Sequence, residues 1–462
     1  MSLVPLGGRS RAAIIGLAAL ALTLTAAPAM AATPGPPTPI DLFNDFEACA
    51  TDANSPIYLN AFGGVSLQAL SQDTVDSPFV TEQFQVFPVS EPSQVVTFSN
   101  QFALPGIEES VSVPQSNFTE GQTYAWDVQT VAASGTSAPS GLCYFTVDDT
   151  APSSAPTVIS ANYPSGQRDQ GGAPIQLTFG ANGVNDVSGY VFSWFGVLPV
   201  PVLATIGPHG IPQPSDPFTA DPANFAAAST LGGSATVSLV PPFDSGLLVL
   251  TVASLDRAFN ESPPTTYFIF VKPDAPTITQ LNPNVPFDKN GEFHLTPDPG
   301  LEAASPVTSY TVQLFGQTGG QTFTVKASAS GNAEFGATLD SPIGEFILVT
   351  STSADGWVSQ NSFFGSPIDT TPTVSSDVYL ENQSSGGVGV PGTFTFAPKV
   401  KGIANYAFAF SDGTGGTVAA QGNGTAQITW TPSESGFNFL DVFGTTKDGI
   451  QLTDYFYVFF VN

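Results

Sequence analysis

The chain has 462 residues, of which 38 are acidic and 10 basic, so its formal net charge is −28. Phosphate binding depends on clustered cations, and so acidic a sequence without a basic run excludes nucleic acid as a partner. Low total charge with 45 Gly, 41 Pro and 37 Phe is typical of β-sandwiches and gives little support to helices. The chain is too long for one core and too apolar for disorder, so we expect several domains of about 100 residues.

The first 31 residues have the features of a secretory signal peptide. Arg9 and Arg11 precede an uncharged apolar stretch, residues 12–27, and small residues follow it up to Ala31. This stretch is short for a membrane span, and no other apolar run approaches that length. We therefore expect a secreted, extracellular protein, or one associated with the cell envelope, without a membrane span once the leader is removed. Eight basic residues then remain against 38 acidic ones.

A short sequence motif occurs three times, each time after an aromatic, β-branched run. The three copies are Ala155-Pro156-Thr157-Val158, Ala275-Pro276-Thr277-Ile278 and Thr371-Pro372-Thr373-Val374. Recurrence at a domain-sized period indicates tandem modules. The predicted fold class is all-β, with tandem antiparallel immunoglobulin-like β-sandwich modules in an extended array, because the prolines at the junctions limit bending. The expected order is a signal peptide at 1–31, a disulfide-bonded module at 32–150, a module at 151–272 with a Pro-rich insertion at 195–233, a divergent module at 273–366 and a last module at 367–462.

The first module contains both cysteines and the clearest strand pattern. Cys49 and Cys143 form an even pair in an exported chain, which predicts a disulfide, whereas no Cys-x-x-Cys spacing or nearby His supports a redox or metal role. In the segment 123–131, Tyr124, Trp126 and Val128 share one face of a strand by period-2 alternation. With the preceding Gly turn and the strand after Cys143, this pattern resembles the F and G strands of a fibronectin type III domain.

The later modules carry a more specific resemblance. The segments Val147-Asp148-Asp149-Thr150-Ala151-Pro152, Ser234-Ala235-Thr236-Val237 and Leu255-Asp256-Arg257-Ala258-Phe259-Asn260 resemble the tandem immunoglobulin-like repeats of exported actinobacterial surface proteins. The resemblance covers most of the chain after the leader. It implies a spacer or accessory role beside lectin-like or catalytic domains, but this chain has no recognisable domain of either kind.

No catalytic residues are assigned. A Ser triad needs a His base near the nucleophile, and the two histidines, His209 and His294, fall in different modules without a Gly-x-Ser-x-Gly elbow. A glycosidase needs two carboxylates across a cleft, and with so many acids a pair such as Asp256 and Glu261 carries no information. We expect a non-enzymatic protein without cofactors.

Calcium is the ion that the sequence favours most. Asp148 and Asp149 lie in a linker close to turns that could add carbonyl ligands, and Asp256 and Asn260 form a similar group. Neither group matches the spaced Asp-x-Asp-x-Asp-Gly loop, and Asp and Asn are ordinary turn formers. We therefore assign no metal site and keep these four residues as the candidates for structural calcium.

Ligand binding has two candidate elements. The 195–233 insertion is a long Pro-rich excursion, and long loops often carry function. Among the tryptophans, Trp126, Trp194 and Trp430 lie in strand patterns that fit a core face, so we expect them to be buried. Trp357 follows a turn and is the candidate for an exposed ligand platform.

The sequence thus predicts a secreted or cell-surface structural spacer built of immunoglobulin-like modules. The alternative is an adhesin or carbohydrate-binding protein that uses the insertion or exposed aromatics, with a cell-wall or extracellular polysaccharide or another surface protein as partner. An envelope-acting hydrolase is the third hypothesis. The sequence does not decide whether the chain self-associates.

Overall fold

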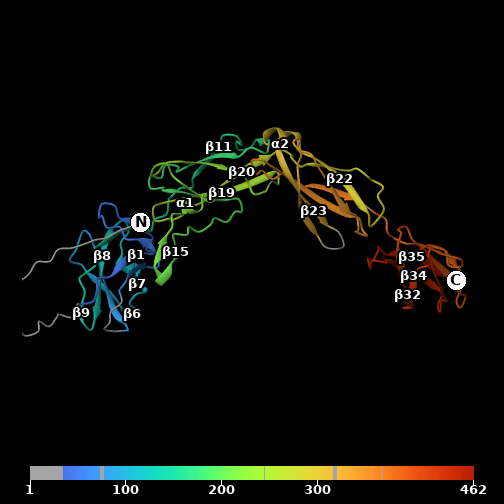
Figure 1. Ribbon diagram of the computed structural model, residues 1–462, viewed down its shortest axis with the longest axis horizontal. Helices are drawn as coiled ribbons and strands as arrows, with labels where there is room; N and C mark the ends of the chain where they lie inside the picture. Colours follow the sequence, from blue (N-terminus) through green and yellow to red (C-terminus); the bar gives the residue numbers. More distant parts are fainter. Residues whose placement is uncertain (1–34, 73–77, 244, 316–319, 367) are drawn as a thin grey trace, which may run out of the picture.

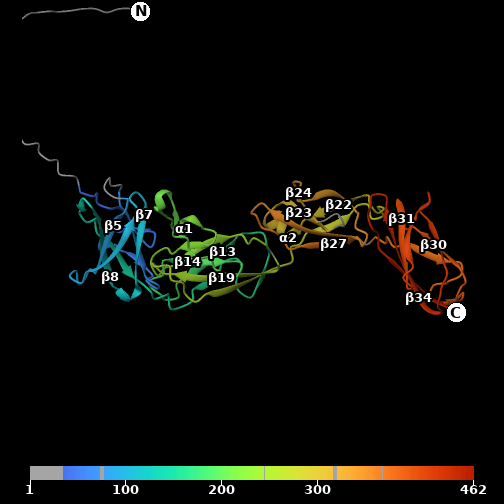
Figure 2. The same cartoon turned by 90° about the horizontal axis from the view of Figure 1, so that it is seen from below.

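The computed structural model describes residues 35–72, 78–243, 245–315, 320–366 and 368–462. The predicted leader, residues 1–31, lies outside them. Within these ranges the chain is nearly all β, which confirms the predicted fold class. Four pairs of sheets follow one another along the chain and lie in an elongated, arched row (Figures 1 and 2). No helix of the described chain is long and apolar enough to cross a membrane.

The first module, residues 40–147, packs a four-stranded sheet against a larger one. The sheet orders are β2-β1-β4-β7 and β3-β10-β8-β5-β6, with β9 paired to β8. Its elements are β1 (Ile40–Asn44), β2 (Glu47–Ala48), β3 (Ile57–Leu59), β4 (Val65–Leu70), β5 (Val80–Pro88), β6 (Val96–Ala103), β7 (Glu108–Val113), η1 (Gln115–Asn117), β8 (Thr123–Ala132), β9 (Gly135–Thr136) and β10 (Cys143–Val147).

The disulfide between Cys49 and Cys143 is confirmed. It joins the loop after β2 to the last strand, β10, and Cys143 is fully buried. Beside it, the predicted core face of β8 is also confirmed, because Tyr124, Trp126 and Val128 are all buried. The disulfide therefore links a segment near the start of the module to its last strand, beside the core that β8 faces.

The second module, residues 157–271, has sheets of order β11-β13-β18 and β12-β20-β19-β14-β17 and a separate β15-β16 hairpin. The 195–233 insertion supplies that hairpin, a short helix and the edge strand β17. The elements are β11 (Thr157–Ser160), β12 (Arg168–Asp169), β13 (Ile175–Gly180), β14 (Gly189–Ser193), β15 (Ala204–Ile206), η2 (Pro208–Gly210), β16 (Pro212–Pro214), α1 (Pro217–Ala220), β17 (Phe225–Ala227), β18 (Ala235–Leu239), β19 (Leu247–Leu255) and β20 (Thr265–Val271).

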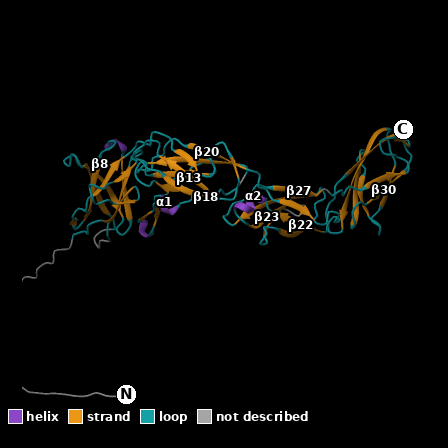
Figure 3. Ribbon diagram, turned by 90° about the horizontal axis from the view of Figure 1, so that it is seen from above, coloured by secondary structure: helices purple, strands orange, loops and turns teal. Residues whose placement is uncertain are grey.

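The third and fourth modules, residues 277–366 and 373–461, repeat the arrangement (Figure 3). The third has sheets β21-β22-β25 and β24-β23-β26-β27, and the fourth has β28-β30-β33 and β29-β35-β34-β31-β32. The elements are β21 (Thr277–Gln280), β22 (Asn290–Thr296), α2 (Pro299–Ala304), β23 (Val307–Phe315), β24 (Gln321–Lys326), β25 (Ala333–Thr338), β26 (Glu345–Ser353), β27 (Ser362–Ser366), β28 (Thr373–Ser376), β29 (Ser384–Ser385), β30 (Gly392–Ala397), β31 (Ile403–Phe410), β32 (Gly415–Ala419), β33 (Ala426–Trp430), β34 (Gly436–Thr446) and β35 (Tyr455–Val461).

One hydrogen bond recurs at the same place in these three modules and ties their two sheets together. A buried tyrosine of β14, β23 or β31 donates its hydroxyl to the carbonyl of a glycine two residues before β18, β25 or β33, at 2.6, 2.6 and 2.8 Å respectively. The pairs are Tyr190 with Gly233, Tyr310 with Gly331 and Tyr406 with Gly424. The divergent third module therefore shares the sandwich of its neighbours.

Removal of the disulfide is expected to destabilise the first module alone. A cross-link between residues 94 positions apart stabilises a fold by about 4 to 5 kcal/mol on the chain-entropy model. In the double variant Cys49→Ser/Cys143→Ser, one calorimetric transition should shift to a lower temperature while the transitions of the other modules keep theirs. An unchanged profile, or a shift of all transitions together, would contradict this.

Candidate functional site at the module junctions

The four calcium candidates meet at the first junction, where the first module joins the second. The side-chain amide of Asn260 donates to the Asp148 carbonyl oxygen at 2.6 Å and to Asp256 Oδ2 at 2.9 Å. Asp256 Oδ1 accepts the backbone N–H groups of Ala258 and Asn260. Asp149 Oδ1 instead accepts the N–H of Ala61 at 2.5 Å. Among these bonds, the one from Asn260 to the Asp148 carbonyl crosses the junction, whereas those of Asp256 stay within its turn.

The electrostatics of this junction follow from its burial. Asp256 is fully buried, and desolvation raises its pKa to about 6 although Asn260 donates to it. No group of three or more His, Cys, Asp or Glu side chains that could hold a metal ion occurs among the described residues. Structural calcium at these positions stays an untested prediction.

Further contacts extend the first junction. The guanidinium carbon of Arg257 lies 3.5 Å from the centre of the Tyr58 ring, an arrangement that favours cation–π attraction. The amide of Asn60 donates to the side chain of Asn260. Two residues of the first module thus bind the turn after β19 in the second.

The Pro-rich insertion also reaches the first module. Its β16 contacts β2, and its η2 contacts β7, as the position of β15 beside β7 in Figure 1 suggests. A Cβ atom placed on Gly210 would lie 3.4 Å from Cβ of Glu108. The insertion, expected as a surface excursion, is therefore in part a brace between two modules. Its role in ligand binding stays a prediction.

Glu108 is half-buried beside this brace, close to Asp41 and Glu82. Neither of its carboxylate oxygens has a hydrogen-bond partner among the described residues, and both are shielded from solvent. Burial, followed by the charges of Asp41 and Glu82, raises the pKa of Glu108 to about 9. Burial likewise raises the pKa of Glu82 to about 7, although Ser71 donates to it.

The second junction joins the second and third modules through Trp357. The prediction that Trp357 forms an exposed ligand platform is wrong, because this side chain is fully buried. Its indole Nε1–H donates to Asp274 Oδ2 at 3.0 Å, and its ring stacks on Tyr163 with the centroids 6.0 Å apart. The turn that carries Trp357 faces the neighbouring module, so a side chain that would be exposed on an isolated module becomes part of a core.

Asp274 and Gly171 complete this junction. Asp274 is fully buried and also accepts the backbone N–H of Gln360 at 2.8 Å. A Cβ atom at Gly171 would lie 2.7 Å from Asp274 Oδ2 and 2.9 Å from the Trp357 ring, so only glycine fits there. Buried side chains of the second and third modules form one continuous hydrophobic cluster. Among the other tryptophans, the predicted burial is confirmed for Trp126 and Trp430, whereas Trp194 is only half-buried.

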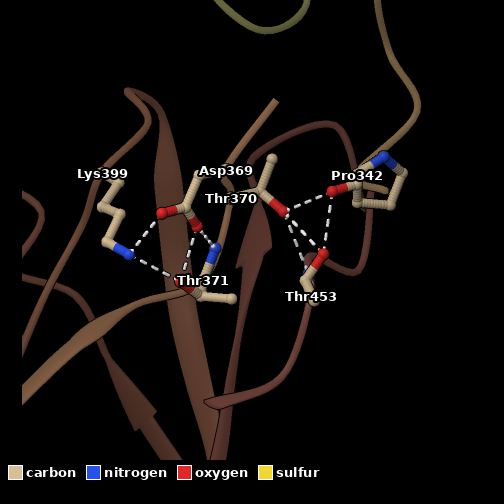
Figure 4. Close-up of polar contacts among 6 residues, drawn as sticks. All are labelled: Pro342, Asp369, Thr370, Thr371, Lys399 and Thr453. Carbon is tan, nitrogen blue, oxygen red and sulfur yellow. Dashed lines mark hydrogen bonds and ion pairs between the residues drawn. The ribbon is translucent and has the colours of Figure 1, made fainter. Parts of the chain in front are cut away.

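The third junction, between the third and fourth modules, is held by hydroxyl groups (Figure 4). The hydroxyls of Thr370 and Thr453 both donate to the Pro342 carbonyl oxygen at 2.8 Å and lie 3.0 Å from each other. Phe287 of the third module is buried in the hydrophobic cluster of the fourth. A side chain from one module therefore completes the core of the next.

An exposed ion pair accompanies these contacts. Lys399 Nζ lies 2.6 Å from Asp369 Oδ2, and Thr371 donates to the same carboxylate (Figure 4). The hydrogen bond from Lys399 holds the pKa of Asp369 below its ordinary value. Exposed pairs of this kind contribute little to stability, so Thr370, Thr453 and Phe287 carry this junction.

Sequence reasoning missed most of these residues, among them Asp274, Tyr163, Thr370 and Thr453. One signal could have found part of the set. Each linker has an aspartate two or three residues before a proline, and each of these carboxylates accepts hydrogen bonds at its junction. They are Asp149 before Pro152, Asp274 before Pro276 and Asp369 before Pro372. The two histidines, His209 in η2 and His294 in β22, lie in different modules, and His294 pairs with Glu334 at 3.3 Å.

No protein-family model matches this chain, and no curated protein sequence is significantly similar to it. Solved structures match parts of it, and three of them are described below. The match with the chicken CNTN1 FN1–FN3 domains covers 72% of this chain and 100% of that one, at 14% identity and a TM-score of 0.20. The match with the Clostridium thermocellum CbhA fibronectin(III)-like modules covers 40% of this chain and 94% of that one, at 16% identity and a TM-score of 0.16.

The third match is Salmonella alpha-2-macroglobulin reacted with methylamine. It covers 91% of this chain but only 33% of the other, at 9% identity and a TM-score of 0.25. At these TM-scores the chains do not superpose as wholes. The β-sandwich assignment therefore rests on the strand pairing described above, and none of the three matches bears on function.

Replacing Asp274 by alanine is expected to destabilise the second and third modules together. The change removes the acceptor of the buried Trp357 indole N–H, and an unsatisfied buried donor costs about 1 to 3 kcal/mol. The exposed Asp355, in the turn that precedes Trp357, gives the matched control Asp355→Ala. Calorimetry should show a lower unfolding temperature for the first variant only, and equal profiles would contradict a role for the buried bond.

The first module is expected to lose stability as the pH rises. A carboxyl group whose pKa is raised on folding stabilises the fold while it is protonated, below its unfolded pKa, and loses that contribution as the pH rises through its folded pKa. Glu82 loses its contribution as the pH rises from about 4.5 through its folded pKa of about 7. Glu108 loses its contribution as the pH rises from about 4.5 through its folded pKa of about 9. Thermal unfolding between pH 5 and pH 9 should show the decline, and Glu108→Gln should flatten it. The exposed Glu91→Gln is the control, and a flat wild-type profile would contradict the assignment.

Proposed function

We propose that this chain is an exported, non-catalytic spacer that holds its two ends apart at or outside the cell envelope. The observation that carries the proposal is the cross-module bonding at all three junctions, from Asn260, Asp274 and Thr370. A chain of modules joined only by free linkers bends at every linker, whereas these contacts restrict each joint.

Several features support export to an oxidising compartment. The predicted leader precedes a module that contains a disulfide, and disulfides persist outside the cytosol. A strongly negative chain also stays soluble and resists self-association through charge repulsion. The resemblance of segments 147–152, 234–237 and 255–260 to the tandem immunoglobulin-like repeats of exported actinobacterial surface proteins agrees with a surface location.

Small-angle scattering of the chain from residue 32 tests the proposal. A compact protein of about 430 residues has a radius of gyration of about 22 Å. A stiff row of four modules should give a value at least one and a half times larger, with a pair-distance distribution skewed to long distances.

The variant Thr370→Val/Thr453→Val provides the comparison, since it removes the hydroxyls that bond to Pro342. It should broaden the distribution by loosening one joint. A wild-type radius near 22 Å would rule out the spacer.

A further inference from the structure

A groove at the third junction is lined by four of the eight basic side chains that the chain has after the predicted leader. It is lined by Lys289, Lys399, Lys401 and Lys447, and we call it the lysine groove. Beyond residue 31 the chain has only eight Lys and Arg against 38 acidic residues. The four lysines come from three separate segments, one just before β22, one between β30 and β31 and one between β34 and β35. The fold, and not a basic run in the sequence, creates this positive site.

Two of these lysines carry charge that no carboxylate of the described chain offsets directly. Lys399 pairs with Asp369 at 2.6 Å, and Lys289 lies 3.7 Å from Asp288. The ion pairs found among the described residues involve neither Lys401 nor Lys447, and both side chains are exposed. Their ammonium groups are therefore free to bind an anion from solution.

The groove is large enough for a ligand of several rings. It consists of two adjoining hollows of about 590 and 850 Å³ that share Lys399, Lys401 and Lys447. The larger hollow has three lysines and no acidic residue in its lining. The smaller one contains Asp288, Asp369 and Asp448 as well as apolar side chains. Volumes of this size are usual for small-molecule and oligomer sites.

The lining favours a sparsely charged, ring-containing ligand. Val285, Pro286 and Ile368 offer an apolar surface in the smaller hollow, against which the C–H face of a sugar ring can pack. Lysine ammonium groups act as point charges that accept an anion in many orientations. A densely charged polymer such as nucleic acid would meet the surplus of acids outside the groove, whereas one carboxylate per sugar matches the spacing of a few separate lysines.

We propose that the lysine groove binds an acidic polysaccharide through its carboxylate groups. The groove would give the row of modules a point of attachment along its length. This binding does not require the row to be stiff, so the site and the spacer function can be tested separately.

The experiment measures binding of polygalacturonate to the chain from residue 32 by titration calorimetry at low salt, with neutral dextran and a single-stranded oligonucleotide as further probes. The test variant is Lys401→Glu/Lys447→Glu, which changes two exposed side chains. The matched control is Lys272→Glu/Lys326→Glu, which makes the same change of net charge at exposed positions that do not line the groove.

The wild type should bind polygalacturonate, and raising the salt to about 1 M should abolish this binding because screening weakens exposed charge pairs. The groove variant should bind at least tenfold more weakly, while the control stays within twofold of the wild type and circular dichroism shows all three folded. Absence of polygalacturonate binding, an equal loss in the control, or binding of the oligonucleotide alone would overturn the proposal.

Discussion

The buried carboxylate of Asp274 is the contact on which the middle of the chain depends. Its two oxygens accept hydrogen bonds from the Trp357 indole and from the Gln360 backbone, both in the following module. A β-sandwich buries its inner faces but leaves loops at its ends, where apolar side chains have no cover. Here the two facing ends cover each other, so Tyr163 and Trp357 enter one shared core. Separating the modules would leave the Asp274 carboxyl group and the Trp357 indole without these partners, which opposes bending.

Each of the three linkers contains an aspartate that accepts hydrogen bonds, but the three aspartates differ in how far they are buried. Asp149 is half-buried and accepts the backbone N–H of Ala61, Asp274 is fully buried, and Asp369 forms an exposed pair with Lys399. Hydrogen bonds are stronger where water is excluded, and exposed ion pairs contribute little, so the middle joint gains most from its aspartate and the third gains least. The third joint relies instead on threonine hydroxyls and on the burial of Phe287.

Charge is distributed unevenly along the row, and this has consequences at both ends. No lysine or arginine occurs in residues 32–150, and the brace from the second module contacts Glu108, which lies close to Asp41 and Glu82. Neighbouring carboxylates repel one another, and this repulsion favours the protonated form of each carboxyl group. Near the other end the few lysines are brought together instead. The same strongly acidic chain thus has carboxyl groups with raised pKa values near its first joint and a local cationic groove at its third.

The sequence by itself determined the fold class, the disulfide and the core faces of strands such as β8, because period-2 alternation and an even cysteine pair are local or compositional signals. It also marked the linkers through their prolines. The burial of Trp357, the brace formed by residues 195–233 and the meeting of Lys289 with Lys447 were decided only by the tertiary structure. Each depends on which loops lie at the same end of a sandwich and on which neighbour that end faces. Such relations between residues far apart in the chain leave no periodic pattern in its sequence.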